Sequence, residues 1–174
     1  MDNYQLQLLS KENSEAFFKL MEDNRSRLED FFAGTVAKTR TKEATQKYCL
    51  EIEDKITNKT YFPYLIIDNQ SQQLVGLIDV KNIDWSIPKA ELGAFIDTAY
   101  EGKGLIQHFG LILIEQIVAE HQFKKLLCRA ASTNKRSVRT IQQLGFKLEG
   151  TVRRDYKTTK GELVDLDYYG RIFD

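Results

Sequence analysis

Apolar positions recur along the chain with two spacings, and each spacing predicts a different kind of element. Seven stretches alternate apolar and polar residues or form short runs of β-formers, which is typical of strands with a buried face. Four stretches repeat apolar residues every three to four positions, which is typical of helices with one face in the core. The predicted strands are 4–9, 61–67, 74–80, 91–97, 125–131, 146–156 and 162–172, and the predicted helices with their caps are 10–32, 41–56, 105–121 and 132–144.

The order of these elements predicts the fold class. A strand, two helices and a hairpin come first, followed by strand, helix, strand, helix and two final strands. This order is typical of a mixed α/β sheet with helices on both faces. A strand–helix–strand unit over 91–131 lies at its centre and makes a right-handed crossover if its strands are parallel neighbours. We see no repeat or linker, so we draw no domain boundary.

Glycine and proline mark the predicted breaks between elements. Gly34 predicts a break between helices, within a charged connection after the first helix. Pro63 favours a strand end or an edge position, and 68–72 has the composition of a hairpin turn. Gly76 indicates a bulge or a close backbone approach. Residues 82–89 read as a connection between strands.

The stretch 91–106 carries the candidate chemistry. Gly102 and Gly104 leave the backbone bare where a strand gives way to a helix, whose first N–H groups and dipole favour an anion. Lys103 adds a positive charge. The pattern favours a phosphate site, although a short Gly-x-Gly is also common in a simple tight turn. The helix that follows is predicted to bury one face formed by Leu105, Phe109, Ile112, Leu113 and Ile117.

Composition narrows the class of protein. A length of 174 residues suits one domain with a real core, and a formal net charge of zero gives no bias toward nucleic acid or anionic membranes. The cysteines, Cys49 and Cys128, form no disulfide framework or metal cluster and suit a reducing compartment. We find no signal peptide and no membrane span, which needs roughly 18 apolar residues. We therefore expect a soluble, cytoplasmic protein.

Three stretches together resemble the Gcn5-related N-acetyltransferase (GNAT) superfamily. Ala90-Glu-Leu-Gly-Ala-Phe-Ile96 resembles its central strand, and Tyr100-Glu-Gly-Lys-Gly104 resembles its acetyl-CoA pyrophosphate loop. Residues 134–137 and 143–150 resemble its second cofactor motif. Within the superfamily, the chain most resembles the bacterial ribosomal-protein N-terminal alanine and serine acetyltransferases. The resemblance implies a single N-acetyltransferase domain over residues 1–174, with a mixed, mostly antiparallel sheet.

The resemblance also implies which residues bind the co-substrate, acetyl-CoA. Backbone groups of Phe95 and Ile96 would meet the pantetheine arm, backbone amides of 102–106 would hold the pyrophosphate, and the Asn134 side chain would contact the cofactor arm. No metal is implied. The predicted cofactor-binding residues are Phe95, Ile96, Glu101, Gly102, Lys103, Gly104, Leu105, Ile106 and Asn134.

Two positions depart from the family pattern. Glu101 stands where the family's loop usually begins with Gln or Arg, and Ile106 stands where it usually has Gly or Ala. A carboxylate near a pyrophosphate is unfavourable unless it points away. Because backbone amides make most of such a site, we expect acetyl-CoA to bind nonetheless.

Glu91 and Ser137 are the candidate catalytic residues. The resemblance places Glu91 on the strand beside the thioester, where a carboxylate acting directly or through water could take a proton from the amine. A solvated or ion-paired strand residue is the structural alternative for Glu91. Many family members use a tyrosine as the acid, but Ile141 stands at that position. Ser137 resembles the serine given that role in the ribosomal subfamily, and helix capping is its alternative.

Other reactive side chains have simpler explanations in the sequence. His108 and His121 have no visible partner, so solvated or packing roles are expected, and Cys128 reads as inert core. Trp85 could be core, lid or partner surface. A local basic cluster could meet a ribose phosphate, an acidic partner or RNA, but a solvated surface is the expected reading at zero net charge. The cluster comprises Arg136, Arg139, Arg153, Arg154, Lys157 and Lys160.

These observations leave three functional hypotheses. The first is an acetyl-CoA-dependent N-acetyltransferase acting on a protein N-terminal amine of the ribosomal type or, alternatively, on a small amine, amino acid or antibiotic. The second is a non-catalytic CoA-binding module, suggested by Glu101, Ile106 and the missing tyrosine. The third is an RNA- or ribosome-binding protein, although we expect no nucleic-acid partner. Family members often pair, so a homodimer stays open, with no residue locating an interface.

Overall fold

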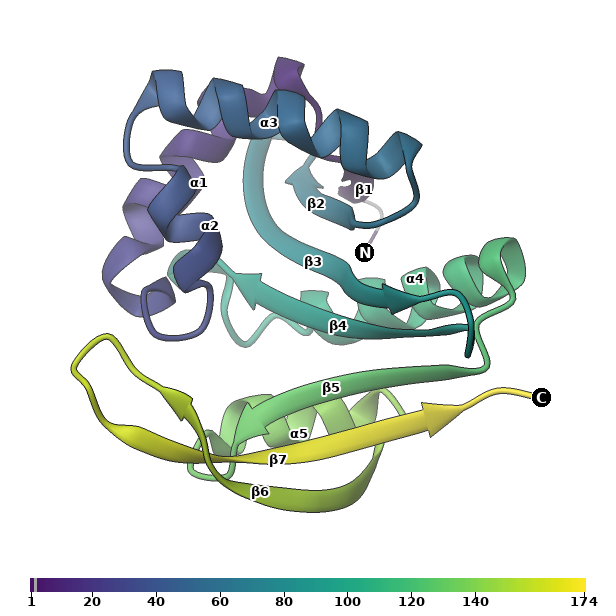
Figure 1. Ribbon diagram of the computed structural model, residues 1–174. Helices are drawn as coiled ribbons and strands as arrows, with labels where there is room; N and C mark the ends of the chain where they lie inside the picture. Colours follow the sequence, from purple (N-terminus) through teal and green to yellow (C-terminus); the bar gives the residue numbers. More distant parts are fainter. Residues whose placement is uncertain (2) are drawn as a thin grey trace. The chain divides into compact units, whose positions relative to one another are not determined.

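The structure is a computed structural model that describes residue 1 and residues 3–174. Across these residues, seven strands form one sheet in the order β1-β2-β3-β4-β5-β7-β6 (Figure 1). The pairs β1/β2, β5/β7 and β6/β7 are antiparallel, and β4/β5 is parallel, so the predicted mixed, mostly antiparallel sheet is confirmed. The bounds are β1 Tyr4–Leu8, β2 Phe62–Asp68, β3 Gln73–Asp84, β4 Lys89–Ile96, β5 Lys125–Ala131, β6 Lys147–Lys157 and β7 Leu163–Ile172.

The helices follow the predicted order with one addition, α2. The bounds are α1 Ser14–Leu28, α2 Ala33–Lys38, α3 Lys42–Thr57, α4 Leu105–His121 and α5 Lys135–Gln143. Gly34 lies inside α2, so the predicted break at this residue is wrong. Tertiary contacts override the low helix propensity of glycine because Val36 is buried and Arg25 donates to the carbonyl oxygens of Val36 (3.2 Å) and Thr39 (2.7 Å).

Half of the predicted connection 82–89 belongs to the strands, namely residues 82–84 and 89. β3 continues to Asp84 and β4 begins at Lys89, so only a tight turn separates them and the expected length of the connection is wrong. Trp85 belongs to this turn and stacks on the ring of Phe123, with 5.3 Å between the ring centroids. The turn also has local hydrogen bonds, because the backbone N–H and the hydroxyl of Ser86 both donate to Asp84 Oδ1.

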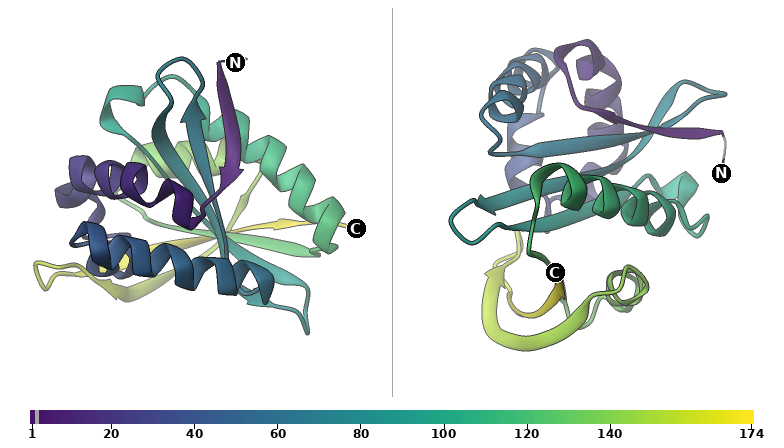
Figure 2. Two further views of the ribbon diagram at one scale, coloured as in Figure 1. Left: turned by 90° about the horizontal axis from the view of Figure 1, so that it is seen from above. Right: turned by 90° about the vertical axis from the view of Figure 1, so that its right-hand side faces the viewer.

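The chain packs as two compact units, which are described separately. The first unit comprises Met1–Asp79 and Ala94–Lys103. Its helices α1 and α3 lie side by side (Figure 2). Its core includes Phe17, Met21, Ile52, Leu65 and Leu77. A Cβ added to Gly76 would lie 2.9 Å from the carbonyl oxygen of Phe95, which confirms the predicted close backbone approach.

The second unit comprises Val80–Gly93 and Gly104–Asp174. Its parallel pair β4/β5 begins in register at Lys89 and Lys125, with α4 connecting the two strands in sequence. The helix α4 buries the predicted face except at Ile112, which is 44% exposed. Ile114 is buried instead, because the buried arc of the helix runs from Leu105 round to Ile114 and leaves Ile112 just outside its edge.

Pro63 is the second residue of β2, which lies between β1 and β3. Of the two predicted positions for this proline, the strand end is therefore confirmed and the edge strand is wrong. The carbonyl oxygen of Pro63 accepts a hydrogen bond from the backbone N–H of Leu9 at 2.9 Å. Among the described residues, no helix is both long enough and apolar enough to cross a membrane.

Candidate functional site

The loop before α4 has a bare backbone. Gly102 (φ 76°) and Gly104 (φ 72°) both adopt the left-handed conformation, which glycine takes without strain. Gly104 is the N-cap of the 17-residue helix α4 and supplies no capping side chain, so the first-turn N–H groups remain available to a ligand. A Cβ added to Gly102 would meet no atom within 4 Å, so glycine is required there for its backbone angle rather than for space. These features suit an anion.

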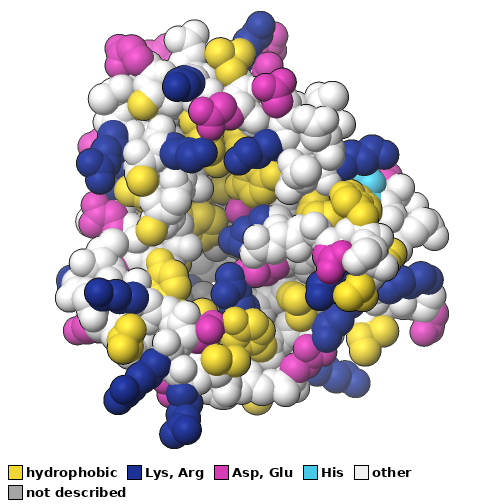
Figure 3. Space-filling view, in the orientation of Figure 1, with side chains coloured by type: hydrophobic (Ala, Val, Ile, Leu, Met, Phe, Trp, Pro, Cys, Tyr) yellow, Lys and Arg dark blue, Asp and Glu magenta, His cyan; other side chains and the backbone are white. Residues whose placement is uncertain are grey.

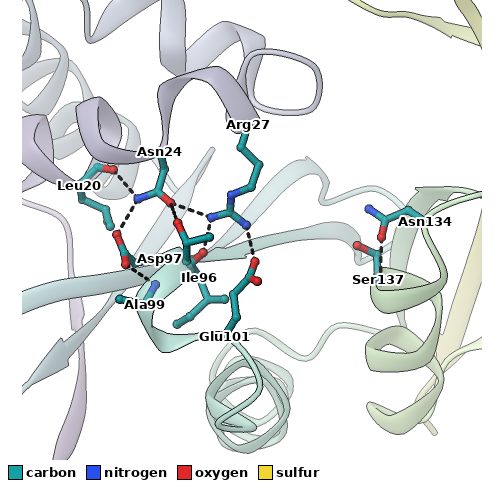
Figure 4. A network of polar contacts seen from close by, with 10 residues as sticks. Leu20, Asn24, Arg27, Ile96, Asp97, Ala99, Glu101, Asn134 and Ser137 are labelled. Carbon is teal, nitrogen blue, oxygen red and sulfur yellow. Dashed lines mark hydrogen bonds and ion pairs between the residues drawn. The ribbon is translucent and has the colours of Figure 1, made fainter.

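Glu101, the residue before Gly102, is held by an arginine from α1 (Figure 4). Arg27 Nη1 donates to Glu101 Oε1 at 2.9 Å, and the two side chains are 38% and 19% exposed. Arg27 Nη2 donates to Asn24 Oδ1 at 2.8 Å and to the backbone carbonyl oxygen of Ile96. The carboxylate that departs from the family pattern is therefore paired with a cation.

The buried side chain of Asn24 extends this network toward the end of β4. Asn24 is 2% exposed, and its Nδ2 donates to the carbonyl oxygen of Leu20 at 3.0 Å and to Asp97 Oδ2 at 2.7 Å. Asp97 Oδ1 accepts a hydrogen bond from the backbone N–H of Ala99 at 2.8 Å. Side chains of α1 thus hold the segment that leads into the glycine loop.

A second set of contacts holds the same segment through Tyr100. Its hydroxyl donates to Asp68 Oδ2 at 3.2 Å. Hydrogen bonds from backbone N–H groups, chiefly that of Gln70, lower the pKa of Asp68 and so favour the ionised acceptor. Lys103 Nζ lies 4.1 Å from the centroid of the Tyr100 ring, within cation–π range. The predicted positive charge of the loop therefore has a defined place over an anchored aromatic ring.

The apolar residues predicted to bind cofactor are largely packed. Phe95 is 6% exposed and meets Phe32 edge to face at 5.1 Å, while Ile96 offers its carbonyl oxygen to Arg27. Leu105 is 2% exposed at the start of α4, and Ile106 is half-buried. The side chains of Phe95 and Leu105 are therefore used in packing, and the roles of these residues toward a cofactor stay predictions.

Glu91 lies on β4 in the second unit and is 9% exposed. Its Oε1 accepts from Arg129 Nε at 3.0 Å and its Oε2 accepts from Asn82 Nδ2 at 2.9 Å. Glu91 is therefore ion-paired in the structure, as the structural alternative to a catalytic role predicted. Each carboxylate oxygen still has a second lone pair, so these bonds leave Glu91 able to accept a proton.

The pair Glu91–Arg129 belongs to a polar row that crosses the strands of the second unit. Arg129 on β5 lies opposite Tyr168 on β7, and Arg129 Nη1 donates to the Tyr168 hydroxyl at 3.4 Å. That hydroxyl donates to Asp155 Oδ2 on β6 at 2.6 Å, and Arg129 Nη1 lies 3.9 Å from the same oxygen. Burial disfavours the charged guanidinium, but the bonds to Tyr168 and Glu91 outweigh burial and raise the pKa of Arg129.

Asn134 and Ser137 meet at the start of α5. Asn134 is the N-cap of this helix, and its Oδ1 accepts from the backbone N–H of Ser137 at 3.1 Å (Figure 4). The predicted capping cluster is therefore confirmed at Asn134. The roles of Asn134 toward the cofactor and of Ser137 as an acid stay predictions.

The remaining reactive side chains are mainly packed or exposed on the surface. The ring of His108 lies edge to face with that of Phe109, with 4.9 Å between the ring centroids. The centroid of the His121 ring lies 5.9 Å from that of Trp85 and 5.8 Å from that of Phe123. Cys128 is buried at 5% exposure. Members of the basic cluster are exposed, and Figure 3 shows lysine and arginine interspersed with acidic side chains on the face it displays.

Sequence reasoning missed six residues of these networks, Asn24, Arg27, Asn82, Arg129, Asp155 and Tyr168. Arg129 had a visible signal, since it is the charged residue inside the apolar run Leu-Leu-Cys-Arg-Ala-Ala of β5. Asn24 also had a signal, since it is the polar residue within the buried stripe of α1 that Leu20, Met21 and Leu28 form. Arg27 had none, because it is an exposed helix residue whose partner lies 74 residues away.

Comparison with known proteins agrees with this architecture. A family model described as an acetyltransferase (GNAT) domain matches residues 5–147. The "Probable N-acetyltransferase YjcK" of Bacillus subtilis is 22% identical over 79% of this chain and 77% of its own length. The ribosomal-protein-serine acetyltransferase of Escherichia coli is 24% identical over 60% of this chain and 58% of its own length.

Solved structures share the fold over almost the whole chain. The ribosomal-protein-S5-alanine acetyltransferase of Vibrio fischeri superposes with a TM-score of 0.91 at 18% identity, covering 100% of this chain and 95% of that one. The spermidine N-acetyltransferase of Vibrio cholerae, solved with CoA and spermine, superposes with a TM-score of 0.81 at 17% identity, covering 99% and 96%. The chain therefore belongs to the GNAT acetyltransferase family, and its resemblance to the ribosomal-protein acetyltransferases is confirmed.

Proposed function

We propose that this acetyltransferase takes its acetyl group from acetyl-CoA and delivers it to a protein N-terminal amine of the ribosomal type. The observation that carries the donor half is the pair of left-handed glycines, Gly102 and Gly104, leading into the open N-terminus of α4. A diphosphate suits this geometry because several N–H groups and the helix dipole converge on one anion. Backbone amides of 102–106 would hold it, with Lys103 adding charge.

Two observations support acetyl-CoA as the donor. The spermidine acetyltransferase that shares this fold was solved with CoA. In this chain the one carboxylate of the loop, Glu101, is paired with Arg27 and so does not present an uncompensated charge to a diphosphate. The acetyl thioester of the donor supplies the electrophilic carbonyl carbon.

The acceptor step requires a neutral amine and somewhere for its proton to go. A C–N bond forms as the C–S bond breaks, the amine loses one proton and the departing thiolate gains one. An N-terminal amine has a pKa of about 8, so part of it is neutral at pH 7 and a strong base is unnecessary. Glu91 would take the proton directly or through water, held in one orientation by Arg129 and Asn82. Ser137 would donate a hydrogen bond to the thiolate.

The charge of the polar row supports a cationic acceptor. Glu91 and Asp155 contribute two negative charges and Arg129 one positive charge, so the row carries a net charge of −1. A protonated amine is attracted to such a row before it loses its proton. We further propose that residues 1–174 act as a single N-acetyltransferase domain, since the family match at 5–147 draws on both compact units.

A small polyamine is the second candidate acceptor. A negative row also suits spermidine, and a spermidine acetyltransferase shares the fold. CoA release should be measured with peptides beginning with alanine or serine, with the same peptides N-acetylated as controls, and with spermidine. We expect the free peptides to give at least about tenfold higher kcat/KM than spermidine. A higher kcat/KM for spermidine would contradict a protein N-terminus as the acceptor. An absence of reaction with every amine would contradict both the proposed acceptors and the role of Glu91 as the base.

A further inference from the structure

The charge of Glu101 is the feature that the proposed donor site leaves unexplained. This carboxylate directly precedes Gly102, whose backbone is offered to a diphosphate. Two like charges within several ångströms repel by about 1 kcal/mol or more even near a protein surface. A loop that takes a diphosphate must therefore neutralise Glu101 or turn it away. This inference rests on the proposed donor function and concerns how the loop meets that requirement.

Arg27 meets this requirement from another element. Its Nη1 donates to Glu101 Oε1 at 2.9 Å, while Nη2 donates to Asn24 and to the Ile96 carbonyl oxygen. One guanidinium thus uses both terminal nitrogens in a fixed fork, which an ammonium on a flexible stem would not reproduce. Figure 4 shows the three acceptors converging on Arg27 from α1, from the end of β4 and from the loop.

The position of Arg27 is itself fixed by a buried residue. Asn24 is 2% exposed and gives its amide hydrogens to the Leu20 carbonyl oxygen and to Asp97. This leaves Asn24 Oδ1 as an acceptor that faces Arg27, and Thr98 Oγ1 approaches the same oxygen at 3.3 Å. The guanidinium is therefore positioned before any ligand arrives, and its charge stays beside the loop.

We propose that Arg27 is a positioning residue for the donor diphosphate, acting by cancelling the charge of Glu101 and keeping that carboxylate turned toward α1. The contacts of Arg27 agree with this role, because the guanidinium meets the carboxylate of Glu101 and its other two acceptors are the neutral oxygens of Asn24 and Ile96. The ion pair is thus electrically balanced before binding, and the backbone N–H groups of 102–106 supply the attraction.

The alternative is that the Arg27–Glu101 ion pair only ties the loop to α1, a role we call a mechanical latch. This alternative predicts the opposite effect of Glu101→Gln on binding. If the ion pair only tied the loop to α1, then Glu101→Gln would loosen the loop and weaken binding. If Arg27 instead compensates charge, Glu101→Gln removes the repulsive group, leaves Arg27 with a surplus positive charge and strengthens binding. The sign of this one change separates the two accounts.

The test is calorimetric titration of four proteins with CoA and with dephospho-CoA, which lacks only the 3′-phosphate. The proteins are the wild type, Arg27→Gln, Glu101→Gln and the double variant. We expect Arg27→Gln to weaken both ligands about three- to tenfold, Glu101→Gln to tighten both by a similar factor, and the double variant to return close to the wild type. Lys42→Gln and Glu15→Gln are matched controls, because they remove the same charges from an exposed ion pair between α3 and α1.

Each other outcome overturns the proposal. Glu101→Gln binding that is unchanged or weaker identifies a latch, and a double variant as weak as Arg27→Gln shows that no charge was being cancelled. A loss confined to CoA assigns the charge to the 3′-phosphate. If Arg27→Gln fails to fold, the sign at Glu101→Gln decides alone. If the wild type binds neither ligand, both the proposed donor function and this inference are wrong. If the wild type binds but the affinities of the variants rank differently from the order given above, this inference alone is wrong.

Discussion

Each compact unit contains an arginine that holds a glutamate, and the two pairs differ in what surrounds them. Arg27–Glu101 in the first unit spans 2.9 Å and Arg129–Glu91 in the second spans 3.0 Å. The arginine side chains are similarly exposed, at 38% and 33%, and the side chains of the two glutamates, taken without their backbone atoms, are 19% and 11% exposed. The two ion pairs are therefore similar in length and exposure, although Arg27 donates through Nη1 and Arg129 through Nε.

The charge beyond each pair is different. In the first unit, Arg27 meets the carboxylate of Glu101, and its other two acceptors are the neutral oxygens of Asn24 and Ile96, so the contacts of this arginine are balanced. In the second unit, Asp155 adds a carboxylate 3.9 Å from Arg129, so that row is negative. A balanced network suits a loop that must accept an anion, and a negative row suits the approach of an ammonium group. The same Arg–Glu contact can thus support opposite ligand preferences, according to its neighbours.

The largest expected effect comes from Glu91→Gln. The amide keeps the size of the side chain but cannot take a proton, so we expect kcat to fall about 100-fold, within the range for loss of a general base. The affinity for CoA should stay within about twofold, because the donor loop is untouched. Steady-state kinetics with calorimetry measures both quantities.

Glu149→Gln is the matched control for that variant. It removes the same charge from an ion pair of the second unit, Lys125–Glu149 at 2.8 Å, outside the polar row. We expect its kcat to remain within about twofold of the wild type. If Glu91→Gln behaved like this control, Glu91 would be a structural ion-pair residue and not the base.

Arg129→Met should have a smaller effect on catalysis. Removing the cation leaves Glu91 with Asn82 as its remaining partner of the row, so we expect kcat/KM for the amine to fall about tenfold. Arg129→Lys keeps the charge without the planar fork, so we expect it to recover only part of this loss. A kcat/KM for Arg129→Met equal to that of the wild type would contradict a positioning role for Arg129.

Replacing Gly102 of the loop should weaken the free energy of CoA binding by about 1 kcal/mol. Gly102→Ala places a Cβ at φ 76° with no clash, so the cost is the left-handed backbone alone, about 1 kcal/mol. We expect CoA to bind about five- to tenfold more weakly, measured by calorimetry. Gly34→Ala is the control, since it also meets no atom within 4 Å but lies in α2. That change should raise the melting temperature and leave CoA binding unaltered.

Thiol labelling of Cys49 tests the packing of the first unit. Cys49 in the first unit is fully buried, and burial raises the pKa of its thiol to about 11. At pH 7.5 roughly one thiol in three thousand would be ionised, so native Cys49 should react with a thiol reagent only on opening of its unit. We expect the rate of Cys49 labelling, followed by mass spectrometry, to rise together with unfolding in denaturant. Rapid labelling of the native protein would contradict the packing of this unit.

The sequence predicted best those elements whose signals are local. The bounds of α4 and β5 agree with the predicted ranges 105–121 and 125–131, because sharp changes of apolar spacing mark their ends. The helix α2 was missed because Gly34 signalled a break, while the contacts that stabilise the helix come from Arg25 on α1.

The partners of the candidate residues could not be predicted in the same way. Glu91 and Glu101 were recognisable from their motifs, but Arg129 is 38 residues from Glu91 and Arg27 is 74 residues from Glu101. Such pairs are set by sheet register and by packing of α1, which no local pattern encodes. The sequence therefore indicated which carboxylates matter, and the structure showed that each is paired with an arginine.

The central claim is that the bare loop before α4 binds the diphosphate of acetyl-CoA. Titrating the purified wild-type chain with acetyl-CoA in a calorimeter tests it most directly. The account predicts saturable binding of one molecule per chain with a Kd of about 1 μM or lower, which corresponds to about −8 kcal/mol. Gly102→Ala in the same experiment should weaken that binding. An absence of saturable binding, or binding indifferent to Gly102→Ala, would contradict the account.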